Sequence, residues 1–207
     1  NRVLNFANSS NGGLLTLKNI TIANGYSTDN GSGFKSNMAN VAIEGSKIKD
    51  NLGGGAFFTQ STNNDQVTSS DISGNTGSYL VISYGGLAVS NSTISNNSGR
   101  VYSIGASYDS VTFSSNNGSL QSSGGLAISN STYDSNVGYI RGYGGNVSIN
   151  ASTLSNNTST STGLLWFDNN VGAVQIKDTV VSGNTHTGNA EFMQSRGSST
   201  LISNSIF

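Results

Sequence analysis

A repeat of about 19 to 27 residues runs through the whole chain and constrains its fold more than any other feature. The phrase LAVSNSTISNN, which begins at Leu87, returns from Leu126 as LAISNSTYDSN and from Val147 as VSINASTLSNN. A large apolar residue recurs before the polar end of each copy, in a column made of Ile22, Ile48, Ile72, Ile94, Phe113, Tyr133, Leu154, Val181 and Phe207. A second apolar column lies between these positions and contains Phe34, Phe57, Leu80, Val101, Leu120, Ile140, Leu165 and Phe192. Two columns that keep step along the chain indicate a repeat architecture.

The pattern inside each copy predicts strands. Apolar and polar residues alternate, as in Leu87-x-Val89, and a period of two is typical of a strand. Each copy reads as three short strands joined by polar turns, and no copy can bury its apolar side alone, so neighbouring copies must stack. We therefore predict an all-β parallel β-helix, a solenoid of about eight to nine three-strand coils and roughly 40 Å long, as a single domain over residues 1–207.

The composition agrees with continuous parallel ladders and excludes several classes of protein. Ser, Asn, Gly and Thr make up more than half of the 207 residues, and there is no proline, which central strands avoid because it lacks an N–H donor. Cysteine is absent, which excludes a disulfide scaffold. The net charge of -1 gives no electrostatic case for nucleic acid as a partner, and no apolar window suggests a membrane-spanning helix.

One polar column is as regular as the apolar ones. Asparagine forms turns readily, and stacked coils would place these amides above one another, each donating to the next. We predict a structural asparagine ladder of Asn51, Asn75, Asn97, Asn116, Asn136, Asn157 and Asn184. Paired glycines, such as Gly85-Gly86 and Gly124-Gly125, open many repeats and fit a sharp corner or a bulge.

The repeat resembles that of the polymorphic outer-membrane proteins. GGLAV at Gly85 and GGLAI at Gly124 are similar to the GGA-[ILV] motif of this family, and FSSN at Phe113 matches its companion FxxN motif. The resemblance implies right-handed β-helix coils. It also implies a bacterial surface protein, since many members are autotransporter passengers and many are adhesins.

The sequence offers little for catalysis, and we expect no catalytic residue, metal site or cofactor. Glu44 and Asp109 share a column position but lie about three coils apart, too far for a paired-carboxylate hydrolase. The other acids, Asp65 among them, are expected at the surface or as turn caps. The single histidine, His186, is expected in an exposed turn, and one histidine without cysteine cannot build a His/Cys metal site.

Aromatic residues suggest a binding surface instead. Tyr84 and Tyr143 each precede a glycine pair, and Tyr79 and Tyr139 lie nearby, with Arg100 and Arg141 alongside. An exposed file of tyrosines could stack on sugar rings, whereas an inward file would form part of the core.

The functional expectation is an extracellular, adhesive β-helix of a microbial cell surface or surface fibre, with host or neighbour-cell glycans or proteins as partners. Two alternatives stay open: a carbohydrate-active or tailspike-like β-helix, and a self-assembling filament subunit. An ice- or surface-binding solenoid would be supported by a regular Thr-x-Thr file, and the sequence has none. The chain opens on a strand pattern and closes inside a repeat. We expect either a segment of a longer solenoid or coils that stack head to tail between chains.

Overall fold

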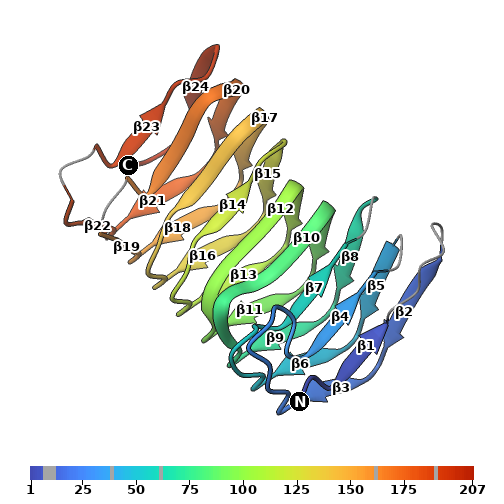
Figure 1. Ribbon diagram of the computed structural model, residues 1–207. Coiled ribbons are helices and arrows are strands. Elements are labelled where there is room, and N and C mark those ends of the chain that lie inside the picture. The colour runs from blue at the N-terminus through green and yellow to red at the C-terminus, as the bar shows by residue number, and fades with distance from the viewer. Residues whose placement is uncertain (7–12, 38–39, 61–62, 161–162, 189–190) are drawn as a thin grey trace.

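The computed structural model describes residues 1–6, 13–37, 40–60, 63–160, 163–188 and 191–207. All regular structure in these ranges is β-strand, and every pairing between the named strands is parallel. The coils stack in chain order, with the two ends of the chain at opposite ends of the stack (Figure 1). The predicted all-β parallel β-helix is confirmed, as a β-solenoid of about eight turns.

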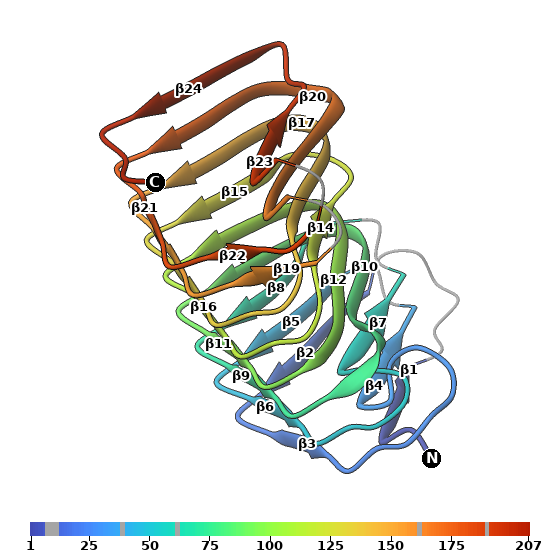
Figure 2. The same ribbon diagram turned by 90° about the vertical axis from the view of Figure 1, so that its left-hand side faces the viewer.

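Each coil contributes to three faces, which the chain visits in the order I, II, III (Figure 2). Face I is formed by short strands and by the first halves of four long strands. The short strands of face I are β1 (Leu4–Phe6), β4 (Phe34–Ser36), β7 (Phe57–Thr59), β14 (Leu120–Ser122) and β23 (Met193–Ser195). The long strands, which continue into face II, are β10 (Thr76–Ser90), β12 (Ser98–Asp109), β17 (Ile140–Asn150) and β20 (Leu165–Lys177).

The other two faces complete the coil. The short strands of face II are β2 (Leu14–Lys18), β5 (Asn40–Glu44), β8 (Asp65–Thr68), β15 (Leu126–Ser129) and β24 (Ser199–Ser203). Face III is a separate eight-stranded sheet of β3 (Thr21–Ala23), β6 (Lys47–Lys49), β9 (Asp71–Ser73), β11 (Thr93–Ser95), β13 (Thr112–Ser114), β16 (Thr132–Asp134), β18 (Thr153–Ser155) and β21 (Val180–Ser182). A further pair, β19 (Thr158–Ser159) and β22 (Thr185–His186), extends two of the coils.

The apolar columns form the core. The first column, from Ile22 to Val181, is the central register position of face III in every coil, and all of its members there are buried. In the second column the prediction is wrong by one residue in two coils, where Val81 replaces Leu80 and Met193 replaces Phe192. An irregularity of register between Tyr79 and Val81 explains the first shift. The turns vary in length, so sequence spacing alone cannot fix the register across them.

The asparagine column forms a continuous ladder. The side-chain N–H of each asparagine donates to the Oδ1 of the next, at 2.8 Å from Asn51 to Asn75 and between 2.9 and 3.1 Å in the five steps that follow to Asn184. The backbone N–H of each donor asparagine also donates to the same oxygen. Each Nδ2 donates in addition to the carbonyl of the central face III residue in the preceding coil, as Asn97 does to Ile72. The left-handed backbone conformation belongs to the residue before each ladder asparagine, such as Asp50 (φ 55°) and Asn96 (φ 53°), and not to the asparagine itself.

A second ladder, which we did not predict, turns the chain from face II into face III. The backbone N–H of Ser46 donates to the Oγ of Ser70, and that of Ser70 to the Oγ of Ser92. Each of these hydroxyls donates in turn to the carbonyl two residues earlier in its own coil. Val111 replaces the serine in the next coil, after which Ser131 and Ser152 resume the pattern. The recurring serine two residues after face II was the signal for this ladder.

The glycine pairs lie where they were expected, at irregularities of the strands. Register shifts occur between Ser83 and Gly86 in β10 and between Gly145 and Val147 in β17. A Cβ atom on Gly86 would stand 1.9 Å from the Oδ1 of Asn64, so a larger residue there would displace the Asn64 side chain. These bulges sit at the corner between faces I and II and mark the end of the outer surface of face I.

Candidate functional site

Five of the eight tyrosines and the single tryptophan lie on the outer side of face I. Alternation along the strands places them there, because Tyr102 stands between buried Val101 and Ser103, and Trp166 between buried Leu165 and Phe167. We call the outward aromatic residues of face I the aromatic platform, and they are Phe58, Tyr79, Tyr84, Tyr102, Tyr139, Tyr143 and Trp166.

The platform includes all four tyrosines that the sequence suggested. Tyr84 is 48% exposed, while Tyr79, Tyr139 and Tyr143 are half-buried. They are not part of the core, where other aromatic residues stack: Tyr108 packs against Phe113, with ring centroids 5.1 Å apart. The outward orientation keeps the sugar-stacking interpretation open.

The outward positions of face I form a register file across the coils. Backbone pairing places Lys35, Phe58, Ile82, Tyr102, Gln121, Arg141, Trp166 and Gln194 in one line along the solenoid axis. Neighbouring members lie one strand spacing apart, roughly 4.8 Å. The platform is therefore a narrow strip that crosses the coils, in which Phe58, Ile82 and Gln121 are buried beneath their neighbours.

Cations lie over the rings of the platform. The Arg141 guanidinium packs against both Tyr143 and Trp166, 3.7 and 3.5 Å from the two ring centroids. It also forms an ion pair with Asp168, with 2.7 Å between Nη2 and Oδ2. Because the guanidinium contacts two rings and one of its nitrogens is held by a carboxylate, Arg141 restrains the positions of Tyr143 and Trp166.

A hollow of about 390 Å³ lies within the platform. Its walls combine rings with hydrogen-bonding groups, and its lining is Asn30, Tyr79, Ile82, Tyr84, Arg100, Tyr102, Gln121 and Tyr143. The hydroxyl of Tyr102 donates to Ser123 Oγ at 3.3 Å, and Gln121 Nε2 donates to the hydroxyl of Tyr139 at 2.8 Å. Burial raises the pKa of the Tyr143 phenol, with the Arg141 guanidinium opposing part of that increase. The phenol is therefore a neutral hydrogen-bonding group at physiological pH.

The acidic residues are arranged for structure. Glu44 and Asp109 share a register position three coils apart, as predicted. The prediction of a surface position is wrong for Asp65, which is buried because its carboxylate accepts hydrogen bonds from Ser83, from Thr59 and from the backbone N–H of Val41. In the part of the chain that the structure describes, no three His, Cys, Asp or Glu residues gather as a metal site would require.

His186 is not in an exposed turn. It lies in β22, half-buried, with Nδ1 3.1 Å from the carbonyl oxygen of Ser159 in the paired strand β19. The longest spacings between repeats predict protruding loops at 157–163 and 182–189, and the structure shows a short parallel ladder within them. Residues 161–162 and 189 of those loops lie outside the described residues.

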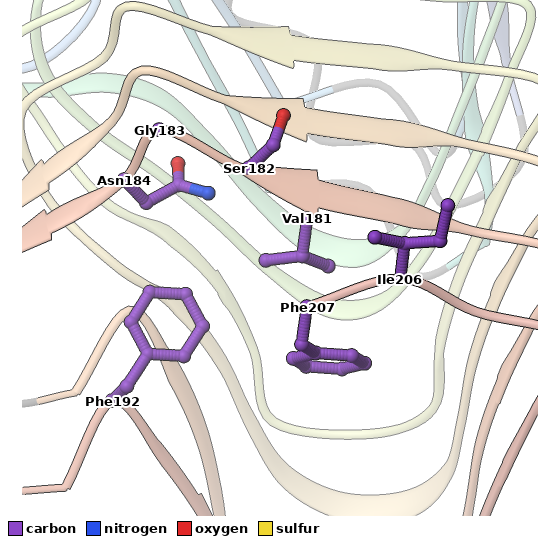
Figure 3. A pocket seen from close by; sticks show the side chains of 7 residues that line it. All are labelled: Val181, Ser182, Gly183, Asn184, Phe192, Ile206 and Phe207. Atoms are coloured by element: carbon purple, nitrogen blue, oxygen red, sulfur yellow. The ribbon is translucent and has the colours of Figure 1, made fainter.

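A second hollow, of about 500 Å³, lies at the last coil. Figure 3 shows Phe192 and Phe207 facing the same space, with Val181 and Ile206 beside it. Within the described ranges there is no helix of the length and apolarity needed to cross a membrane.

Comparison of the chain with protein families, curated proteins and solved structures finds no match.

Proposed function

We propose that this protein is an extracellular, adhesive β-solenoid of a microbial surface, which binds glycans along the aromatic platform and carries out no catalytic step. The observation that carries the proposal is the strip of outward aromatic side chains on a rigid parallel sheet. Flat rings stack on the apolar faces of sugars, and the amide and hydroxyl groups among them can bind sugar hydroxyls.

Rigidity supports this function. Every strand of face I is hydrogen-bonded to its neighbours in the stack, and the rings are held further by Arg141 and by the edge-on contact of Phe58 with Tyr84 at 5.7 Å. A preorganised surface loses little conformational entropy when it binds an extended ligand. The bacterial surface location rests on the resemblance of the repeats to those of the polymorphic outer-membrane proteins.

The double variant Tyr84→Ala/Tyr143→Ala tests the proposal. We expect retention on an array of polysaccharides to fall by about tenfold or more, because two stacking rings, each contributing about 1 kcal/mol, are lost. The melting temperature should stay close to that of the wild type, since neither Tyr84 nor Tyr143 belongs to the buried core.

Tyr26→Ala is the matched control, because Tyr26 is 58% exposed but lies outside the platform. It should leave glycan retention unchanged. A double variant that loses stability while its remaining folded fraction binds normally would overturn the proposal, as would equal loss in the control.

A further inference from the structure

The charges on the platform differ in sign from those of the chain as a whole. The chain carries a net charge of -1, yet Lys35, Arg100 and Arg141 lie on or beside the platform rings. Two carboxylates lie there: that of Asp168 pairs with Arg141, and that of Asp29 lines a hollow with Lys35 and Phe58. Lys35 and Arg100 form no ion pair with a described residue. The platform thus presents two cations without an ion-pair partner among the described residues, and the hollow that Arg100 lines contains no carboxylate.

Both of these cations are backed by rings. The Arg100 guanidinium lies 5.0 Å from the centroid of Tyr79, and the Lys35 ammonium lies 5.3 Å from that of Phe58. A ring behind an arginine limits its motion and leaves its fork of N–H donors free for a planar anion. Arg100 also lines the hollow that Tyr84, Tyr102 and Tyr143 share, so an anionic group bound there would adjoin the stacking rings.

Spacing along the axis suggests an extended ligand. Lys35 and Tyr102 lie in the same register file, three coils or roughly 14 Å apart, and Arg100 is on the same strand as Tyr102. The rings of Phe58 and Tyr84 belong to the two coils between them. Isolated cations separated by rings and amides suit a polymer with an acidic group on some of its sugars. A nucleic acid would favour a closer file of positive charges along its phosphates.

We propose that the glycan bound by the platform is an acidic polysaccharide, lying along the solenoid axis with its carboxylate or sulfate groups on Arg100 and Lys35. This inference rests on the proposed glycan-binding function and specifies its ligand class. Sugar rings stack on the tyrosines, while the two cations select for negative charge.

The test measures binding of the full chain to polygalacturonate, to dextran sulfate and to neutral dextran, each at low and at high NaCl concentration. We expect both or one of the acidic polymers to bind at least about tenfold more tightly than dextran, and this preference to be lost in high salt. A preference for polygalacturonate would identify carboxylate as the recognised group, and a preference for dextran sulfate would identify sulfate.

Arg100→Gln should weaken binding of the acidic polymer by about tenfold, since one charge-assisted contact is removed. Lys47→Gln, which removes a charge from the exposed outer side of face III, is the matched control and should have no effect. Equal loss in both variants would mean non-specific attraction and would overturn the inference.

The remaining outcomes separate the two proposals. Equal, salt-independent binding of dextran and the acidic polymers overturns the acidic-ligand inference and leaves glycan binding intact. Binding of no polysaccharide by the wild type removes the proposed function as well. Tighter binding of single-stranded oligothymidylate than of any polysaccharide would assign the platform to nucleic acid and overturn both.

Discussion

A buried asparagine is stable in this protein because its polar atoms have partners in neighbouring coils. The Oδ1 of Asn97 accepts from both the backbone and the side chain of Asn75, and its Nδ2 donates to Asn116 and to Ile72. Burying such an amide costs little free energy while all its hydrogen bonds are made. The cost becomes large when a partner is removed, because a buried donor without an acceptor has lost its hydration and gained nothing in return.

Asn97→Ala should therefore lower the free energy of unfolding by about 3 kcal/mol or more, since it leaves two donors of Asn75 and the carbonyl of Ile72 without this partner. Chemical denaturation measures the change. The control is Asn117→Ala, an exposed asparagine beside the ladder that should change stability by less than about 0.5 kcal/mol. Similar effects of the two substitutions would contradict a role specific to the ladder.

At the scale of residues, the sequence predicted which asparagines stack but not where the backbone reverses. A column of asparagines suggests both a ladder and left-handed turns, and composition alone cannot separate the two. The structure assigns the ladder to one column and the turns to the residue before it, where Asn, Asp, Gly and Ser alternate and so form no conspicuous pattern.

The strands and turns form the next scale, and one turn contains an unfavourable residue. The turn from face II to face III has a left-handed residue in each coil. Apart from Ala151 it is asparagine in four coils, serine in two, and glycine and aspartate in one each, at Asn19, Gly45, Ser69, Asn91, Ser110, Asn130, Asp178 and Asn204. Ala151 occupies this position with φ 47° and is exposed. An alanine there incurs a steric cost of about 1–2 kcal/mol that no packing offsets.

Ala151→Gly should therefore raise the free energy of unfolding by about 0.5–1 kcal/mol. The same substitution at Ala127, exposed on β15 in face II with no left-handed backbone, should lower it by a similar amount. Thermal or chemical unfolding of both variants tests the sign. Destabilisation by both substitutions would show that strain at Ala151 is negligible.

Strand order and the inward positions could be predicted from sequence, because burial of one side of each strand makes apolar and polar residues alternate in every coil. Tyr133 belongs to an apolar column and is buried, whereas Tyr143 follows the inward Gly142 and points outward. The platform contacts could not be predicted, because the pairing of Arg141 with Trp166 depends on the register of β17 and β20, across turns of variable length.

At the scale of the whole molecule, two hydrogen-bonded carboxylates make stability depend on pH in the acid range. Hydrogen bonds from Ser129, Asn130 and Ser110 lower the pKa of Asp109, and those from Ser155, Ser135 and Asn156 lower the pKa of Asp134. A folded-state pKa below the unfolded value of about 3.9 stabilises the fold above that pH. The contribution is lost as the pH falls through the lowered pKa values.

The double variant Asp109→Asn/Asp134→Asn should thus melt below the wild type at pH 7. The gap between the two melting temperatures should narrow at pH 2.5, because proton uptake by the wild-type carboxylates removes their contribution as the pH falls. Thermal melts at the two pH values measure both gaps. A gap of equal size at both pH values would show that shape, and not ionisation, accounts for the effect of these residues.

The asparagine ladder contributes to the electric dipole of the molecule. One side-chain N–H of each asparagine from Asn51 to Asn157 points to the next coil, in the direction of the C-terminus, and each side-chain oxygen from Asn75 to Asn184 faces the preceding coil. The dipoles of a parallel sheet largely cancel, but these amide dipoles add. The ladder thus gives the solenoid an electric dipole along its axis, with the positive end toward the last coil. Two copies meeting end to end would attract each other in a head-to-tail orientation and repel each other when like ends meet.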